Sequence, residues 1–176
     1  NLRCSYCDTK YAYEQGIEKT IQEITKEVKK YNCKKICITG GEPLQQEDTI
    51  ELIKHLLNCK YSVIVETNGS LKIDSLKNKK KLIISLDIKT PSSKMHEKMF
   101  LKNINILTKK DQIKFIITNK KDFEYAKKII HKFKPKCDIF FQPVWKTNSE
   151  RLAKWILEDN LEVKLGLQIH KIIWGD

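Results

Sequence analysis

Hydrophobic positions recur along this chain with a helical period. Ile17, Ile21, Ile24 and Val28 are spaced three or four residues apart among lysines and glutamates, and this spacing predicts an amphipathic helix. Three further groups with the same period predict three more helices: Ile50, Ile53, Leu56 and Leu57; Phe123, Ala126, Ile129, Ile130 and Phe133; and Leu152, Trp155 and Ile156. Each helix would bury its apolar face against another layer of the protein.

Short apolar runs alternate with these helices, and their length is typical of buried strands. They are residues 35–39, 61–65, 81–86, 112–117, 138–141 and 165–169. Apolar strands that alternate with amphipathic helices predict a parallel sheet whose helices lie outside it. We therefore expect one α/β domain over residues 1–176, an incomplete (β/α)6-type barrel, and we expect its first strand to precede Asn1.

Polar or glycine-containing segments directly follow most of these strands. They are Thr39–Pro43, Glu66–Gly69, Asp87–Ser93, Gln142–Trp145 and Gln168–Lys171. Ligands of parallel α/β folds gather at the carboxyl ends of the strands, so these segments predict an active site at that edge of the sheet. Gln168 and His170 are two residues apart on the predicted sixth strand, which would place them on one face as a substrate-facing pair.

The net charge of +12 raises the hypothesis of a nucleic-acid-binding protein. The basic residues are nearly all lysine, however, since Arg3 and Arg151 are the only arginines. Arginine usually carries base readout and bidentate phosphate contacts. Lysines scattered among isoleucine and asparagine are typical of a solvated surface, so we expect no specific nucleic-acid binding.

The six cysteines follow no spacing that is typical of a disulfide framework. We expect them to be reduced and the protein to be cytoplasmic. The chain contains no run of about 18 apolar residues, so we expect no membrane-spanning segment.

Cys4 and Cys7 form a C-x2-C pair that can bind one metal centre. Two thiolates do not complete a zinc or iron–sulfur site, because both take three or four protein ligands. We expect a third cysteine immediately before Asn1, which would complete a C-x3-C-x2-C loop. Radical S-adenosylmethionine (SAM) enzymes have this loop, and it leaves one iron of a 4Fe-4S cluster open for SAM.

Thr39–Pro43 is a second motif of the same kind. Its paired glycines let the backbone approach a ligand closely, and Glu42 presents a carboxylate beside them. An ordinary strand-to-helix turn, with the proline at the start of the helix, is the alternative. Together with the cysteine loop, the segment resembles the GGEP motif of radical SAM enzymes, which binds the methionine amino group of SAM.

Essentially the whole chain resembles the 7-carboxy-7-deazaguanine synthase family, whose members are radical SAM enzymes of the queuosine and 7-deazapurine pathway. The resemblance rests on Cys4–Thr9, Gly40–Pro43, Glu66–Gly69, Asp87–Ser93 and Gln168–Trp174. The first two segments are common to the superfamily. The Asp-Ile-Lys-Thr-Pro-Ser-Ser and Leu-Gln-Ile-His-Lys-Ile-Ile-Trp stretches are more particular to the family.

The resemblance implies a role for individual residues. Cys4 and Cys7 would be cluster ligands, and Thr9 would coordinate Mg²⁺ beside the substrate carboxylate, which suits a hydroxyl oxygen. The positions that match SAM contacts are Gly41, Glu42, Gly69, Asp87, Ile88 and Lys89. Thr67 matches a substrate contact, and we add the pair Gln168 and His170 as candidate substrate-binding residues.

The resemblance also implies a reaction and partners. The reduced cluster would cleave SAM to a 5′-deoxyadenosyl radical, which would take a hydrogen from 6-carboxy-5,6,7,8-tetrahydropterin. Ring contraction to 7-carboxy-7-deazaguanine with loss of ammonia would follow. An electron donor such as flavodoxin or ferredoxin would reduce the cluster. Homodimers are common in the family, and the apolar segment Ile172–Trp174 would suit such an interface.

Two alternatives compete with this interpretation. Another small radical SAM enzyme, such as an activase that installs a glycyl radical, would share the cysteine loop and the GGEP motif. It would not need Thr9 or the segment around His170. A non-catalytic zinc or nucleic-acid-binding domain would need a second C-x2-C pair, and Cys33 and Cys37 are a poor one because three residues separate them.

Overall fold

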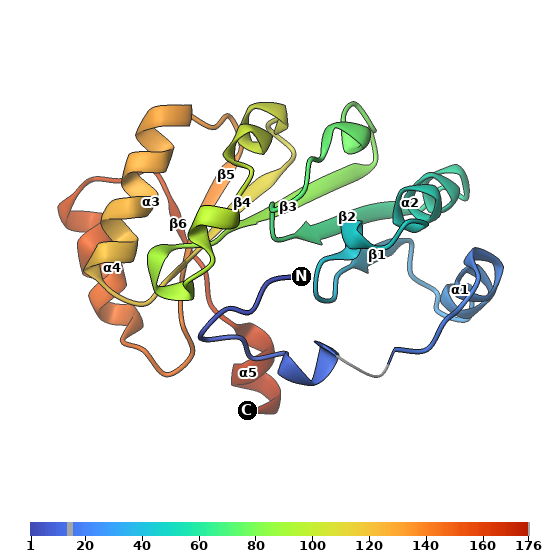
Figure 1. Cartoon of the computed structure of the whole chain (residues 1–176), viewed down its shortest axis with the longest axis horizontal. Coiled ribbons are helices and arrows are strands. Elements are labelled where there is room, and N and C mark those ends of the chain that lie inside the picture. The colour runs from blue at the N-terminus through green and yellow to red at the C-terminus, as the bar shows by residue number, and fades with distance from the viewer. Residues whose placement is uncertain (14–15, 176) are drawn as a thin grey trace.

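A computed structural model describes residues 1–13 and 16–175, and it contains one six-stranded sheet whose neighbouring strands are all parallel. The strands cross the sheet in chain order: β1 (Lys35–Ile38), β2 (Ser62–Thr67), β3 (Leu82–Ile88), β4 (Gln112–Ile117), β5 (Asp138–Pro143) and β6 (Lys164–Leu165). In the described ranges β1 and β6 do not pair with each other, so the sheet stays open (Figure 1). The predicted incomplete parallel barrel is therefore confirmed.

Helices α2 (Thr49–Asn58), α3 (Lys120–Phe133) and α4 (Ser149–Glu158) pack on the outside of the sheet. Helix α1 (Ile21–Val28) lies beside α2, and α5 (Ile169–Trp174) lies apart from them beside the N-terminal segment (Figure 1). Short 3-10 helices occupy much of the connection between β3 and β4. None of the helices in the described residues is both long and apolar enough to cross a membrane.

The hydrophobic core lies between the sheet and helices α2, α3 and α4. Alternation along β2 separates the two faces of the sheet, since Val63 is fully buried in this core whereas Glu66 lies on the other face. At the centre, the ring of Phe141 packs edge to face against Phe115 and Phe123, with ring centroids 5.7 and 5.6 Å away. This packing holds the strands rigidly and so orients the polar side chains of the opposite face.

The first helix begins later than its apolar spacing predicted. Thr20 caps it with a capping box, in which the Glu23 amide donates to the Thr20 hydroxyl (3.2 Å) and the Thr20 amide donates to the Glu23 carboxylate (2.7 Å). Because the cap starts the helix at Ile21, Ile17 lies outside it with 85% of its surface exposed. The prediction that Ile17 belongs to the helix was wrong, because local capping decided the boundary.

Several predicted strands differ from the structure, and β2 and β5 each end two residues later than predicted, at Thr67 and Pro143. The first was predicted to be buried, but β1 is only half covered because it is an edge of the sheet. The third was predicted to end at residue 86, but β3 continues to Ile88. Asp87 therefore projects from a strand rather than from the loop that follows it.

The predicted strand over residues 165–169 was wrong beyond Leu165. β6 ends there, and α5 begins at Ile169. The Gln168 carbonyl oxygen accepts hydrogen bonds from the amides three and four residues later, at 3.0 and 3.3 Å, which starts a helix. Gln168 and His170 consequently do not share a strand face, because a helical step separates them.

The reactivity of the Cys137 thiol, just before β5, reports how well this end of the sheet is packed. Burial raises the pKa of Cys137 to about 11. In the unfolded chain the Cys137 thiol ionises at a lower pH than in the folded protein. The protonated thiol therefore stabilises the folded state fully below the ordinary cysteine pKa, and this contribution is lost as the pH rises through about 11. At pH 9 we expect iodoacetamide to modify native Cys137 at most about one-tenth as fast as in urea-unfolded protein, by peptide mass spectrometry. The exposed Cys33 is the control, and equal native and unfolded rates at Cys137 would contradict its burial.

Candidate active site

A cavity of about 630 Å³ lies at the carboxyl ends of the strands. Its walls come from segments that are far apart in the sequence, represented by Cys7, Glu42, Asp87, Gln142 and Lys171. Every site residue that the sequence predicted lines this cavity except Gly69 and Ile88. The structure thus brings the polar segments together at one edge of the sheet.

The loop that carries Cys4 and Cys7 is attached to the segment after β3. The Ser5 amide donates to the Ser93 carbonyl oxygen (3.1 Å), and the Ser5 hydroxyl donates to the Ser92 carbonyl oxygen (2.6 Å). The Cys7 amide donates to the Cys4 carbonyl oxygen (3.2 Å), which closes a tight turn. Both thiols therefore lie on one fixed turn in the cavity wall.

The two thiols have different electrostatic surroundings. Burial raises the pKa of Cys4, although the ammonium group of Lys89 opposes the effect. Burial also acts to raise the pKa of Cys7, but hydrogen bonds from Tyr13 and Thr9 outweigh it, and the pKa of Cys7 is lowered. The thiolate is the form that binds a metal, and the surroundings of Cys7 favour this form more than those of Cys4 do. In the described part of the chain, no three His, Cys, Asp or Glu side chains are grouped so that they could hold a metal ion.

Glu42 points its carboxylate into a network of protein donors. The Thr67 hydroxyl donates to both carboxylate oxygens (2.8 and 2.9 Å), the Asn68 amide donates to Oε2 (2.7 Å) and the Leu44 amide donates to Oε1 (3.1 Å). Glu42 is 5% and Thr67 1% exposed, so these charge-assisted bonds are shielded from water. A carboxylate has about four acceptor sites, and the Thr67 hydroxyl shares its single hydrogen between the two oxygens, so the three donor hydrogens leave capacity for one more.

Position 69, in the segment after β2, favours glycine for two reasons, its backbone conformation and the closeness of a neighbouring side chain. Its φ is +72°, and an added Cβ would lie 2.8 Å from Cδ1 of the buried Leu86. We expect Gly69→Ala to lower the free energy of unfolding by about 1–2 kcal/mol, measured by urea denaturation. Gly16→Ala is the control, because a Cβ at Gly16 meets nothing within 4 Å. Equal losses in the two variants would contradict a specific requirement at Gly69.

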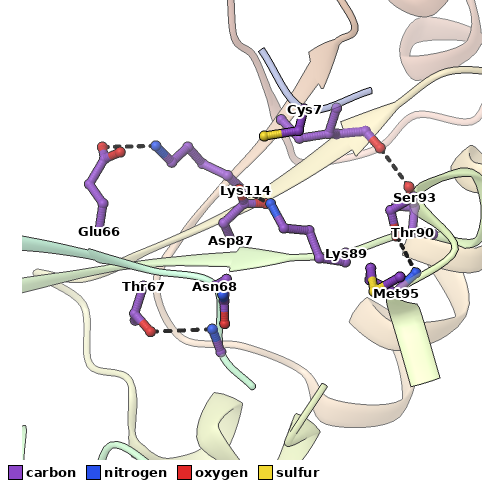
Figure 2. Close-up of polar contacts among 12 residues, drawn as sticks. Cys7, Glu66, Thr67, Asn68, Asp87, Lys89, Thr90, Ser93, Met95 and Lys114 are labelled. Atoms are coloured by element: carbon purple, nitrogen blue, oxygen red, sulfur yellow. Dashed lines mark hydrogen bonds and ion pairs between the residues drawn. The ribbon is translucent and has the colours of Figure 1, made fainter. Parts of the chain in front are cut away.

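Asp87 and Lys89 form an ion pair at the end of β3, with Lys89 Nζ 2.7 Å from Asp87 Oδ2 (Figure 2). Burial would lower the pKa of Lys89, but the adjacent Asp87 carboxylate outweighs it and raises that pKa, so Lys89 is cationic. Asp87 Oδ1 is buried and bonded to no partner in the described residues, which leaves an acceptor for a ligand. Ile88 between them has its side chain in the core (1% exposed), so only its backbone can meet a ligand.

The sequence interpretation missed a second ion pair in the cavity. Lys114 of β4 and Glu66 of β2 are 2.9 Å apart and bridge over β3 (Figure 2). A signal was present, because Lys114 stands in the middle of an apolar strand, where a charge is costly unless it faces a polar cavity. Tyr6 and Trp145 stand in segments that the sequence assigned to the site, but neither was singled out as a site residue. Trp145 Nε1 is buried beside the cavity and bonded to no partner in the described ranges.

The segment at the start of α5 forms the cavity wall nearest the N-terminal loop. Gln168 and His170 both line the cavity although they share no strand face. Gln168 Nε2 donates to Asp8 Oδ2 (3.3 Å), and Gln168 Oε1 is buried with no bonded partner among the described residues. His170 lies at the exposed rim. The two candidate residues of this wall are thus provided by a helix start.

The open parallel barrel and its cysteine loop define a class of protein. The sequence profile of the Radical SAM superfamily matches residues 1–141, so the chain is a radical SAM enzyme, a class that uses a 4Fe-4S cluster and SAM. It is 34% identical to the 7-carboxy-7-deazaguanine synthase of Thermoplasma acidophilum over 176 residues, which are 100% of this chain and 84% of that protein. It is 38% identical to the enzyme of the same name from Clostridium acetobutylicum over 184 residues, 99% of this chain and 83% of that protein. The chain belongs to the 7-carboxy-7-deazaguanine synthase family.

Solved structures agree with this fold. The crystal structure of QueE from Escherichia coli covers 96% of this chain and 80% of its own, with a TM-score of 0.74 and 17% identity. Streptococcus suis SuiB bound to SAM covers 96% of this chain and 44% of its own, with a TM-score of 0.66 and 16% identity. The family prediction made from the motifs is confirmed, and neither a zinc domain nor a glycyl-radical activase is favoured.

Proposed function

We propose that this chain converts 6-carboxy-5,6,7,8-tetrahydropterin to 7-carboxy-7-deazaguanine with loss of ammonia. The observation that carries the proposal is a cavity lined by the family motifs and by buried polar atoms that lack partners among the described residues, on Asp87, Trp145 and Gln168. A buried polar atom without a partner costs about 1–3 kcal/mol, so these atoms indicate a polar ligand. The name shared by the relatives supplies the product.

Cys4 and Cys7 would bind the cluster together with a third cysteine placed before Asn1 in the C-x3-C-x2-C spacing. The residues present fit this group, since both thiols lie on one turn of the cavity wall and the pKa of Cys7 is lowered by its hydrogen bonds despite burial. The Lys89 ammonium, which acts on Cys4, would offset negative charge there. When bound, the cluster supplies the electron that cleaves SAM and so produces the organic radical that starts the ring contraction.

The residues after β1, β2 and β3 would hold SAM. An added Cβ at Gly40 or Gly41 meets nothing within 4 Å, so the backbone there is open to a ligand. Glu42 would use its remaining acceptor site for the methionine ammonium group. Asp87 Oδ1 would accept a hydrogen bond, and Ile88 would contribute its backbone. Lys89 would form part of the same wall, and Gly69, which does not line the cavity, would contribute through the backbone turn after β2.

Thr9 and three further residues of the cavity wall would bind or position the substrate. The Thr9 hydroxyl is 3.5 Å from Cys7 Sγ, beside the cluster position, and is a suitable ligand for Mg²⁺ that also holds the substrate carboxylate. Gln168 and His170 would contact the pterin from the wall at α5. Thr67 also lines the cavity, so we propose that it contacts the substrate there while its hydroxyl holds the Glu42 carboxylate in place for SAM.

The test uses full-length protein reconstituted anaerobically with iron and sulfide, and supplied with SAM, Mg²⁺ and a strong reductant. Production of 5′-deoxyadenosine and ammonia is measured with 6-carboxytetrahydropterin and, separately, with a peptide from a glycyl-radical enzyme. We expect ammonia with the pterin alone. Radical transfer to the peptide would favour the activase, and bound zinc without SAM cleavage would favour the zinc domain.

The proposed function also implies partners and a cellular location for this protein. An electron donor such as flavodoxin or ferredoxin would reduce the cluster, as the family resemblance implies. The small molecule in the cavity would be the pterin, and we propose no nucleic-acid partner. All six cysteines are free, which supports a reducing, cytoplasmic location.

We also propose that the chain forms a homodimer through α5. Ile169, Ile172, Ile173 and Trp174 are each between 60% and 80% exposed, and a second copy would cover them. We expect a dimer by size-exclusion chromatography with light scattering, and a shift to monomer in Ile172→Lys. Leu157→Lys, at an exposed position of α4, is the control and should remain dimeric. A monomeric wild type would contradict the proposal.

A further inference from the structure

Asp8 connects the two ends of the chain at the cavity wall. Its Oδ2 accepts from Gln168 Nε2 (3.3 Å) and is 3.4 Å from Lys171 Nζ. The side chain of Lys171 is mostly buried (15% exposed), whereas that of Asp8 keeps 35% of its surface exposed at the rim. Lys171 Nζ also lies 5.8 Å from the centre of the Trp145 ring. Asp8 itself lies between Cys7 and Thr9, in the loop that carries the cofactor ligands.

The carboxylate of Asp8 determines how the Gln168 amide is turned. An ionised carboxylate only accepts hydrogen bonds, so the amide must present its NH2 group to Asp8. Its carbonyl oxygen then lies at the other end, and this Oε1 atom is buried with no bonded partner in the described part of the chain. Turning the amide over would place two oxygens against each other at Asp8. Gln168 is therefore available to a ligand as an acceptor and not as a donor.

We infer that Asp8 is a positioning residue that makes Gln168 an acceptor for a ring N–H group of the substrate. This rests on the proposed function, in which Gln168 faces the pterin. A pterin ring has an amide N–H and an amino group on one edge, and both require acceptors. Lys171 neutralises the Asp8 carboxylate and, with Gln168, ties α5 to the loop of Cys7 and Thr9. The substrate wall and the cofactor loop are thus held in register by one carboxylate.

Kinetics of reconstituted full-length protein test the orientation of the amide. In Asp8→Asn the new side chain can donate or accept, so the Gln168 amide is free to turn. We expect the KM for the pterin to rise about tenfold, the size of one lost hydrogen bond, with the KM for SAM unchanged. Adding Gln168→Glu to Asp8→Asn restores an acceptor toward the cavity, because the new amide at position 8 can donate to the new carboxylate. The double variant should recover most of the pterin KM, a rescue that a merely structural role would not produce.

Hydrogen exchange of the protein without its cluster tests the tie to α5. We expect the amides of residues 169–174 to exchange about tenfold faster in Asp8→Asn and in Lys171→Met than in wild type. Asp159→Asn is the matched control, since Asp159 pairs with Lys127 and is comparably exposed (26%). It should leave both the exchange of α5 and the pterin KM unchanged.

The outcomes separate this inference from the proposed function. If wild type converts the pterin and Asp8→Asn keeps the same KM, the inference is overturned and the proposed function stands. If wild type does not convert the pterin, the proposed function and the substrate part of the inference fail together. Unchanged exchange in both Asp8→Asn and Lys171→Met would overturn the tie to α5, whatever the activity.

Discussion

Cys7→Ala is expected to reduce SAM cleavage by at least about 100-fold in reconstituted full-length protein. Loss of a residue that only supports a metal ligand costs about 10–100-fold in metal affinity, so loss of a ligand should cost more. Cys7 lies on the turn shared with Cys4, and no other residue in the described ranges is grouped with them to replace it. The measurement is the rate of 5′-deoxyadenosine formation, taken together with iron content and the electron paramagnetic resonance signal of the reduced protein.

Cys33→Ala is the matched control for this substitution. Cys33 is exposed and does not line the cavity, so iron content and rate should equal those of wild type. A Cys7→Ala variant that retained full iron content and full SAM cleavage would contradict the assignment of the cluster to this loop.

Lys89→Met should be the most damaging single change to the charged wall of the cavity. It leaves the Asp87 carboxylate without its partner at a position where the two side chains are only 25% and 13% exposed. Removal of one partner from a buried pair costs about 3 kcal/mol, because the remaining charge stays in a poorly solvated site. We expect urea denaturation to show a loss of about 2–3 kcal/mol and SAM cleavage to fall with it.

A double variant and a surface pair control this prediction. Asp87→Asn combined with Lys89→Met removes both charges and should recover part of the stability, which a double-mutant cycle measures. Lys154→Met breaks a pair with Glu150 whose side chains are 65% and 72% exposed, so it should cost less than about 0.5 kcal/mol. If Lys89→Met lowered the free energy of unfolding no more than Lys154→Met does, the pair of Asp87 and Lys89 would be a solvated one. Its description as a shielded ion pair of the cavity wall would then be wrong.

Periodicity predicted the central elements well because each of them has one buried face. Residues 112–117 were predicted as a strand and form β4 with the same bounds, because every second residue of this interior strand is buried in the core. Two failures occur where a local hydrogen bond decides a boundary. Thr20 starts α1 after Ile17, and the Gln168 carbonyl begins a helix where the apolar spacing of residues 165–169 resembles a strand.

The candidate site could be predicted only where its residues belong to short sequence motifs. Cys4, Glu42 and Asp87 belong to motifs that follow or precede a strand, and the structure brings them to one cavity. Lys114 belongs to no motif, and its pairing with Glu66 depends on the alignment of β2, β3 and β4 across the sheet. The contact of Asp8 with Gln168 joins residues 160 positions apart, which no local pattern can predict.

The most direct test of the central claim is a search for 7-carboxy-7-deazaguanine by mass spectrometry. Full-length protein with a rebuilt cluster is incubated anaerobically with SAM, Mg²⁺, a strong reductant and 6-carboxytetrahydropterin, beside its Cys4→Ala and Cys7→Ala variants. We predict product with the wild-type protein and none with either variant. Cleavage of SAM without this product would contradict the substrate assignment, and bound zinc with no cleavage of SAM would contradict the enzyme assignment itself.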